Sequence, residues 1–164
     1  HVAETVYLNI INLAVKTLYI TTPYLIIDSK LKSALMNAAS RGVDVRIITP
    51  GVPDKKAVYV ITRSHYKELA SAGVKIYELP GSFVHAKQII ADDELACVGT
   101  INLDYRSMLH HYECGVLLYK TSCVSKIKED FQNSFSICEQ KKDFKQNFLV
   151  RIFAALIKLF TPLF

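Results

Sequence analysis

The chain has 164 residues, of which 51% are hydrophobic and 21% charged, and this composition excludes a disordered, collagen-like or coiled-coil protein. Twenty Lys and Arg residues against fifteen Asp and Glu residues give a formal net charge of +5. That charge suits a phosphate-bearing partner, a lipid headgroup or a nucleic acid, and equally suits an ordinary soluble surface. The length allows one domain with a sizeable core.

The first residue, the length of the apolar runs and the cysteines bear on the extent of the protein and on its cellular compartment. The first residue is His1, inside an apolar periodic segment, so we expect a piece of a longer protein. No apolar run reaches the ~18 residues that a membrane span needs. Four cysteines lack C-x-x-C or metal-ligand spacing and are predicted to be reduced, buried thiols of a cytosol-facing protein. These are Cys97, Cys114, Cys123 and Cys138.

Helices and strands alternate through the first half of the chain. Val6, Ile10, Leu13 and Ala14 follow helical spacing, and Asp28 or Ser29 begins a second helix that ends at Gly42. We expect further elements as strands at 18–23, 43–49 and 74–79 and a helix at 55–72.

The second half begins with two strands, 84–91 and 95–98, joined by a hairpin turn at 92–94. A strand at 112–119 and helices at about 122–138 and 142–160 follow. The order predicts an α/β layered domain, with a mixed, mostly parallel sheet flanked by helices and a C-terminal apolar helix. We place the domain at 1–146 and the apolar helix, amphipathic and suited to a membrane interface, at 147–164.

One constellation carries chemistry: His85-Ala86-Lys87, then Asp92, then Gly99-Thr100-Ile101-Asn102. On a strand, His85 and Lys87 point to one face, and the hairpin returns Asn102 beside them. An imidazole, an ammonium and a carboxamide, with the Thr100 hydroxyl near, suit a phosphodiester. Each residue alone is more often structural, but the fixed set of positions favours a catalytic site.

The set H-x-K-(x)4-D-(x)6-G-T-x-N resembles the motif of the phospholipase D superfamily. Segments around it, among them Leu18-x-x-Thr-Thr-Pro-Tyr24 and Val98-Gly-Thr-Ile-Asn-Leu-Asp-Tyr-Arg-Ser107, are similar to the C-terminal half of bacterial cardiolipin synthases. The resemblance runs through nearly the whole chain. It implies that two motifs meet at one active site, that one His becomes a phosphohistidine while the other donates a proton, and that no metal or cofactor is needed.

Carried onto this chain, the resemblance makes His85 the catalytic imidazole, as proton donor, and Lys87 and Asn102 phosphate ligands with Thr100 near. Glu113 takes the place of a carboxylate that such enzymes use to orient a catalytic His. Asp92, at the hairpin turn, and Gly99, which permits close backbone approach, are expected to be structural.

Other features are weaker. His110-His111 lies where many synthases carry an asparagine, and without a third ligand nearby we assign it no metal. His65 is expected at the surface. In the apolar segment 148–160, Arg151 and Lys158 are seven residues apart and are expected to face anionic lipid phosphates at a membrane interface; packing of this helix on the domain is the alternative.

The leading hypothesis is therefore phosphatidyl transfer between two phosphatidylglycerol molecules, giving cardiolipin and glycerol. The partners are the anionic phospholipid, a missing N-terminal half with the first motif, and the cytosol-facing surface of a bacterial cell membrane; nucleic acid is not expected. The alternatives are a single-motif phosphodiesterase or nuclease active as a homodimer, and a catalytically idle lipid-binding module.

Overall fold

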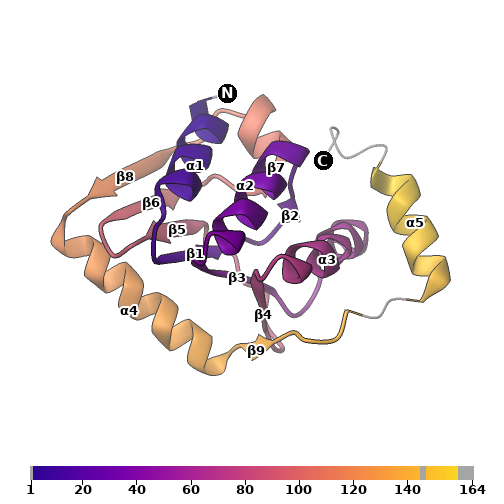
Figure 1. Ribbon diagram of the computed structural model, residues 1–164. Coiled ribbons are helices and arrows are strands. Elements are labelled where there is room, and N and C mark those ends of the chain that lie inside the picture. The colour runs from indigo at the N-terminus through magenta and orange to yellow at the C-terminus, as the bar shows by residue number, and fades with distance from the viewer. Residues whose placement is uncertain (1, 145–146, 159–164) are drawn as a thin grey trace.

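A computed structural model describes residues 2–144 and 147–158. One seven-stranded sheet crosses the molecule in the order β8-β6-β5-β1-β3-β4-β9 (Figure 1). Its central strands β1, β3 and β4 are parallel, and β5, β6, β8 and β9 join them antiparallel. The bounds are β1 Thr17–Thr21, β3 Asp44–Pro50, β4 Lys75–Leu79, β5 Gln88–Ala91, β6 Leu95–Gly99, β8 Gly115–Tyr119 and β9 Glu139–Gln140.

A second, two-stranded sheet pairs β2 (Leu25–Ile26) with β7 (Leu103–Asp104) in parallel. Helices α1, α2 and α3 lie on one side of the main sheet and α4 on the other, while α5 lies beside α3 (Figure 1). A short π-helix, η1, follows β7. The bounds are α1 Val2–Leu13, α2 Ser29–Ser40, α3 Lys56–Ser71, η1 Arg106–His110, α4 Ser122–Ile137 and α5 Phe148–Lys158. The expected α/β layered fold, with a mixed sheet flanked by helices, is confirmed.

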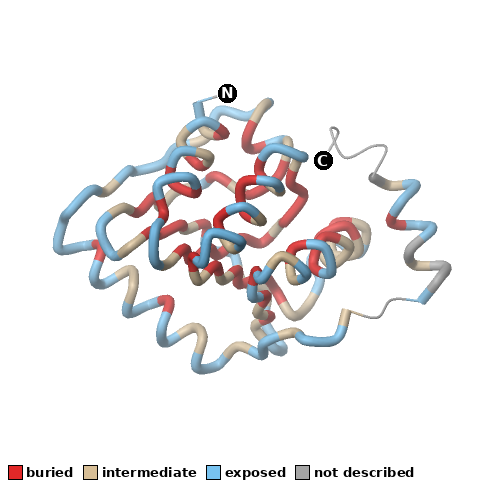
Figure 2. Tube along the Cα trace, in the orientation of Figure 1, coloured by how far each residue is buried: buried red, intermediate tan, exposed pale blue. Residues whose placement is uncertain are grey.

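Alternation along the central strands builds two cores. In β1, Ile20 packs beneath α1 and α2 and Tyr19 packs against α4, and Ile47 and Ile48 of β3 divide in the same way. Solvent hardly reaches the side chains of either core. The buried residues in Figure 2 therefore gather along the sheet, while the outer faces of the helices are exposed. Burial on both sides gives the central strands their continuous apolar sequences.

The helices expected at 55–72 and about 122–138 lie at Lys56–Ser71 and Ser122–Ile137, whereas the helix expected at about 142–160 begins later, at Phe148. Asp28 caps α2 by accepting the main-chain N–H of Leu31 at 2.8 Å, and Gly42 (φ 93°) follows its end. The buried residues of α1 are Glu4, Tyr7, Ile10 and Ile11, whereas Leu13, which shares the helical spacing of the apolar residues, is 66% exposed. The described part of the chain contains no helix long and apolar enough to cross a bilayer.

The Asp92 carboxylate ties the β5–β6 hairpin to the start of β1. It accepts the main-chain N–H groups of Val15, Lys16 and Thr17 at 2.6, 2.6 and 2.8 Å. Asp92 and Asp93 take the turn with φ of 51° and 60°, a conformation that Asp tolerates better than most residues. Burial raises the pKa of the Asp92 carboxyl, but the three N–H donors outweigh burial and lower it.

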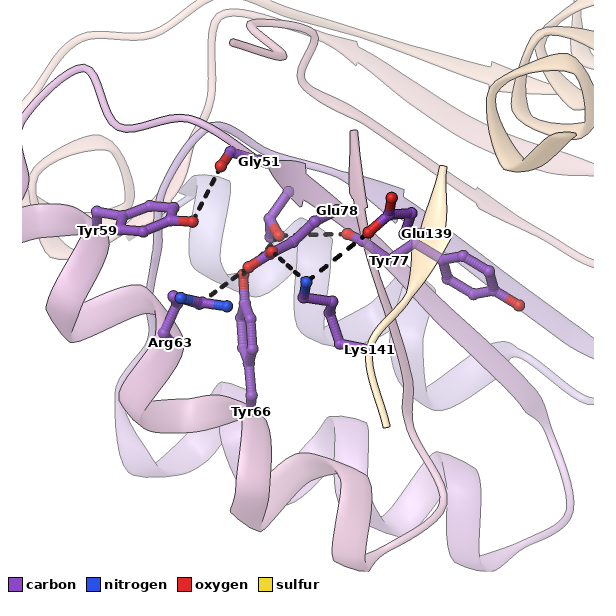
Figure 3. Close-up of polar contacts among 9 residues, drawn as sticks. Gly51, Tyr59, Arg63, Tyr66, Tyr77, Glu78, Glu139 and Lys141 are labelled. Carbon is purple, nitrogen blue, oxygen red and sulfur yellow. Dashed lines mark hydrogen bonds and ion pairs between the residues drawn. The ribbon is translucent and has the colours of Figure 1, made fainter. Parts of the chain in front are cut away.

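A polar cluster around the buried Glu78 carboxylate stabilises the other edge of the sheet (Figure 3). The Glu78 carboxylate accepts the Tyr66 hydroxyl at 3.1 Å and pairs with Arg63 at 3.1 Å and Lys141 at 3.3 Å. The Lys141 N–H also bonds to the Ile76 carbonyl at 2.9 Å. Burial and the neighbouring Glu78 charge raise the pKa of Tyr66. The cluster thereby fixes the chain just after β9, on its way to α5.

Asp92→Asn should lower the free energy of unfolding by roughly 1–2 kcal/mol, because hydrogen bonds to an ionised acceptor are stronger than those to a neutral amide. Since the folded pKa is depressed, wild-type stability should be complete above the unfolded pKa and should fall as pH drops through the folded value. Chemical denaturation between neutral and acidic pH measures both effects.

Asp93→Asn is the matched control, because Asp93 shares the turn but is exposed, and its carboxylate pairs with the Lys128 side chain across the surface. Equal losses in the two variants would contradict a clamp at Asp92.

Candidate active site

His85 and Lys87 lie just before β5 rather than within it, so the strand expected at 84–91 starts four residues late. The last residue of β1, Thr21, pairs with Gln88, and beyond this pair the segment 83–87 has no strand partner. His85 is exposed and Lys87 is only 9% exposed. The two residues therefore lie at the end of the ladder, with His85 open to solvent and Lys87 buried.

The Lys87 ammonium is a buried cation without a matching anion. Its Nζ donates to the main-chain carbonyl of His85 at 2.6 Å and forms no ion pair with any carboxylate of residues 2–144 and 147–158. Burial lowers the pKa of Lys87, and the charges of Glu113 and Asp104 oppose this shift without cancelling it. A bound anion would stabilise the charged form of this group.

Gly99 joins the two parts of the motif. Its N–H donates to the Lys87 carbonyl at 3.2 Å, so the chain after β6 returns beside Lys87. A Cβ at Gly99 would lie 2.1 Å from the main-chain oxygen of Cys114. The expected close approach is therefore made by the chain leading into β8, and a larger residue at Gly99 would push β8 away.

Thr100 and Glu113 form a pair on this edge. The Thr100 hydroxyl donates to the Glu113 carboxylate and accepts the N–H of Cys114 at 3.0 Å. On its other side, Glu113 faces the Nδ1 atom of His111 at 3.8 Å. Thr100 thus holds Glu113 in place, and the carboxylate is close enough to influence Lys87.

Asn102 contributes a polar atom to the site. Its Oδ1 is buried and has no hydrogen-bond partner among the described residues. The next residue, Leu103, is held by an N–H bond to the Thr22 hydroxyl at 3.1 Å and by the β2–β7 pairing. Because buried polar atoms are costly when unpaired, Asn102 marks a place where a ligand or another chain segment can bind.

One aromatic ring lies beside His85 and a second lies behind it, and sequence reasoning missed both. The Phe83 ring lies 5.8 Å from the His85 ring, and Tyr24 lies 6.3 Å beyond Phe83. The Tyr24 hydroxyl donates to Asp54, and burial together with that bond raises the pKa of Tyr24 to about 12. No motif joins these positions in the sequence, since only the fold brings residues 24, 54 and 83 together.

Several histidine and cysteine expectations need correction. His65 is 6% exposed rather than at the surface, because it shares a face of α3 with Ile61 and Leu69. Among the cysteines only Cys97 is buried; Cys138 is half-buried, and two are exposed, Cys114 and Cys123. Within the described ranges, no group of three or more His, Cys, Asp or Glu side chains is placed to hold a metal ion.

A protein-family model described as cardiolipin synthase, PLD-like domain, matches residues 7–135. The cardiolipin synthase of Geobacillus kaustophilus is 38% identical over 99% of this chain, and cardiolipin synthase 2 of Bacillus anthracis is 38% identical over 96%. A protein of unassigned function from Streptococcus mutans is 47% identical over 99%. The chain spans only about a third of these relatives, between 31% and 36% of their lengths.

Solved structures share the fold at low sequence identity. Nuc, a phospholipase D family member from Salmonella typhimurium, matches with a TM-score of 0.73 at 19% identity, over 86% of this chain and 91% of its own. A phosphatidylserine synthase from Haemophilus influenzae matches with a TM-score of 0.78 at 17% identity, over 98% of this chain and 44% of its own.

The Lys87 ammonium should titrate below the usual pH for lysine, and inorganic phosphate should move its titration upward, because an anion favours the charged form. Nuclear magnetic resonance of lysine Cε groups in the presence and absence of phosphate measures both. Lys87→Met should abolish the effect of phosphate on the site, whereas Lys126→Met, a change at an exposed position of α4, should leave it intact. A Lys87 titration that phosphate does not move would contradict an anion site.

Proposed function

Given that the chain belongs to the family of cardiolipin synthase phospholipase D-like domains, we propose that it is the second-motif half of a phosphatidyltransferase. Its reaction joins two phosphatidylglycerol molecules into cardiolipin and releases glycerol. The observation that carries this proposal is the buried Lys87, whose ammonium has no ion-pair partner in the described chain and donates to the main-chain carbonyl of the exposed His85.

These groups divide the work of phosphodiester chemistry. Lys87, assisted by Asn102, holds the non-bridging oxygens, and the low polarity around a buried ammonium strengthens its attraction for the negative charge on phosphate. His85 donates a proton to the leaving alcohol oxygen. The His of the first motif, in the missing half, attacks phosphorus and becomes the phosphohistidine. Thr100 holds Glu113 beside the site, where the Glu113 charge favours the charged form of the Lys87 ammonium and so opposes the effect of burial on its pKa.

The missing half has a place to bind. Strand β8 ends the main sheet, and apolar side chains on both of its faces are more than half exposed: Val116 at 57%, Leu117 at 54% and Tyr119 at 61%. Tyr112, just before β8, is also exposed. An open apolar edge strand is a liability unless another segment covers it. Because the curated relatives are about three times longer, we assign this edge to the half that carries the first motif.

Helix α5 suits attachment to a lipid surface. Its inner side packs on α3 through Ala154 and Ile157, whereas Ile152, Phe153 and Leu156 are exposed. The side chains of Arg151 and Lys158, which we expect to meet lipid phosphates, lie outside the described residues. Because the helix has apolar side chains on both faces, one face can pack on the protein while the other lies on the cytosol-facing leaflet of a bacterial membrane. Packing and interfacial binding are then complementary.

In the full-length protein, His85→Ala should lower cardiolipin formation from phosphatidylglycerol vesicles by about three orders of magnitude or more, because the leaving alkoxide loses its proton donor. Thin-layer chromatography of labelled lipid measures the products. The control is His110→Ala, an exposed histidine of η1.

Near-normal turnover in His85→Ala would contradict the catalytic assignment. If this chain alone formed a dimer by light scattering and cleaved a phosphodiester in DNA, the homodimeric nuclease would replace the synthase.

The triple variant Ile152→Ser, Phe153→Ser and Leu156→Ser should weaken binding to phosphatidylglycerol vesicles by about tenfold or more, because it removes exposed apolar area while sparing the face on α3. Vesicle co-sedimentation measures the partitioning. A matched change at exposed apolar positions far from α5, Val2→Ser with Val15→Ser, should leave partitioning unchanged, and equal losses in both variants would exclude a specific role for α5.

A further inference from the structure

A hollow of about 340 Å³ lies between helix α4 and the carboxyl ends of the central strands. Apolar strand ends form part of its wall, and polar side chains converge on the rest: Thr21, Gln88, Asp130 and Ser134, with His85 also in the lining. The Gln88 amide donates to the Asp130 carboxylate at 3.2 Å, so the strand and the helix meet across it. The described lining contains no Lys or Arg.

The hollow and the Lys87 ammonium lie on opposite faces of the chain entering β5. Ile89 packs beneath α1 and α2, and Ile90 packs against α4. By the same alternation Lys87 turns to the first face and Gln88 to the second, as its bond to Asp130 on α4 shows. His85 lies between the two sites. Its main-chain carbonyl accepts a hydrogen bond from the Lys87 ammonium, and the residue also lines the hollow.

This position matters for an acid–base group. In the function proposed above, His85 gives a proton to the departing alcohol and later takes one from the entering alcohol, so both oxygens must reach the same imidazole. The departing alcohol is glycerol, and the entering alcohol is the glycerol headgroup of a second phosphatidylglycerol. One subsite beside His85, with polar groups and no cation, therefore serves both steps.

We propose that this hollow is the alcohol subsite of the enzyme and binds a glycerol moiety. The Asp130 carboxylate accepts hydrogen bonds from the glycerol hydroxyls, and the Gln88 amide and the Ser134 hydroxyl can donate or accept. The inference rests on the proposed function and adds which alcohol is selected and by which residues. Asp130 and Ser134 come from α4, outside the catalytic motif, and they act on the choice of acceptor rather than on phosphorus.

In the second step the acceptor hydroxyl oxygen forms a bond to phosphorus while the bond from phosphorus to the first-motif His nitrogen breaks. The electron pair of that bond returns to the nitrogen, and the hydroxyl proton passes to His85. Water or a simple alcohol can take the same path. The hollow favours glycerol because a polyol keeps a second hydroxyl for the Asp130 carboxylate.

The test uses the full-length protein and phosphatidylglycerol vesicles with labelled glycerol and ethanol present together. Both alcohols compete for one phosphoenzyme, so the ratio of labelled phosphatidylglycerol to phosphatidylethanol reports selection and does not depend on how much protein is folded. Asp130→Ala should lower this ratio by about tenfold, the effect of losing a hydrogen bond to a charged acceptor. Ser134→Ala should lower it less.

Glu129→Ala, at the neighbouring exposed carboxylate of α4 outside the hollow, is the control and should keep the wild-type ratio. An unchanged ratio in Asp130→Ala, with both products still formed, would overturn the alcohol subsite and leave phosphatidyl transfer standing. A wild-type protein that forms neither product would instead overturn the proposed function and this inference with it.

Discussion

The active-site geometry depends on a carboxylate that lies away from it. Asp92 accepts three consecutive main-chain N–H groups at the start of β1, and this clamp sets how the β5–β6 hairpin lies along β1. From that point the register runs from Leu18 opposite Ala91 to Thr21 opposite Gln88. The ladder ends there, so the next residues toward the N-terminus, Lys87 and His85, leave the sheet at its carboxyl edge.

Main-chain contacts then gather the remaining groups around that edge. The Gly99 N–H reaches the Lys87 carbonyl, and the space that a Gly99 side chain would fill holds the Cys114 carbonyl. Through this close passage β8 delivers Glu113 to Thr100. The motif residues are spread along the sequence, but they lie at the ends of three neighbouring antiparallel strands, β5, β6 and β8. The sheet therefore brings them to one surface. The main-chain positions at the strand ends cannot shift relative to one another without breaking the hydrogen bonds of the ladder.

The electrostatic character of the site follows from its depth. Water and salt would screen the charge of an ammonium at the surface, whereas Lys87 is buried, and burial lowers its pKa. The charges nearest to it, Glu113 and Asp104, act at longer range than an ion pair. The cation stays available to an incoming phosphate. The open edge of β8 and the exposed apolar side chains of α5 are the two surfaces that support the proposed second half and the proposed lipid surface.

The sequence by itself determined the elements that depend on near neighbours. Helical spacing placed α2 and α3, and the Asp28 cap marked the start of α2. The Asp-Asp-Glu turn placed the hairpin, and the motif identified His85, Lys87 and Asn102, because such signals reside in a few adjacent residues. Only the tertiary structure decided that Lys87 is buried while His85 is exposed. The strand β5 begins at Gln88, opposite the last residue of β1, so both residues lie outside the ladder.

The short pairs β2–β7 and β4–β9, the buried place of His65, the Phe83–Tyr24 contact beside His85, and the hollow beneath α4 are also tertiary results. Each joins residues far apart in the chain, and the energy that fixes it comes from packing that no local pattern records.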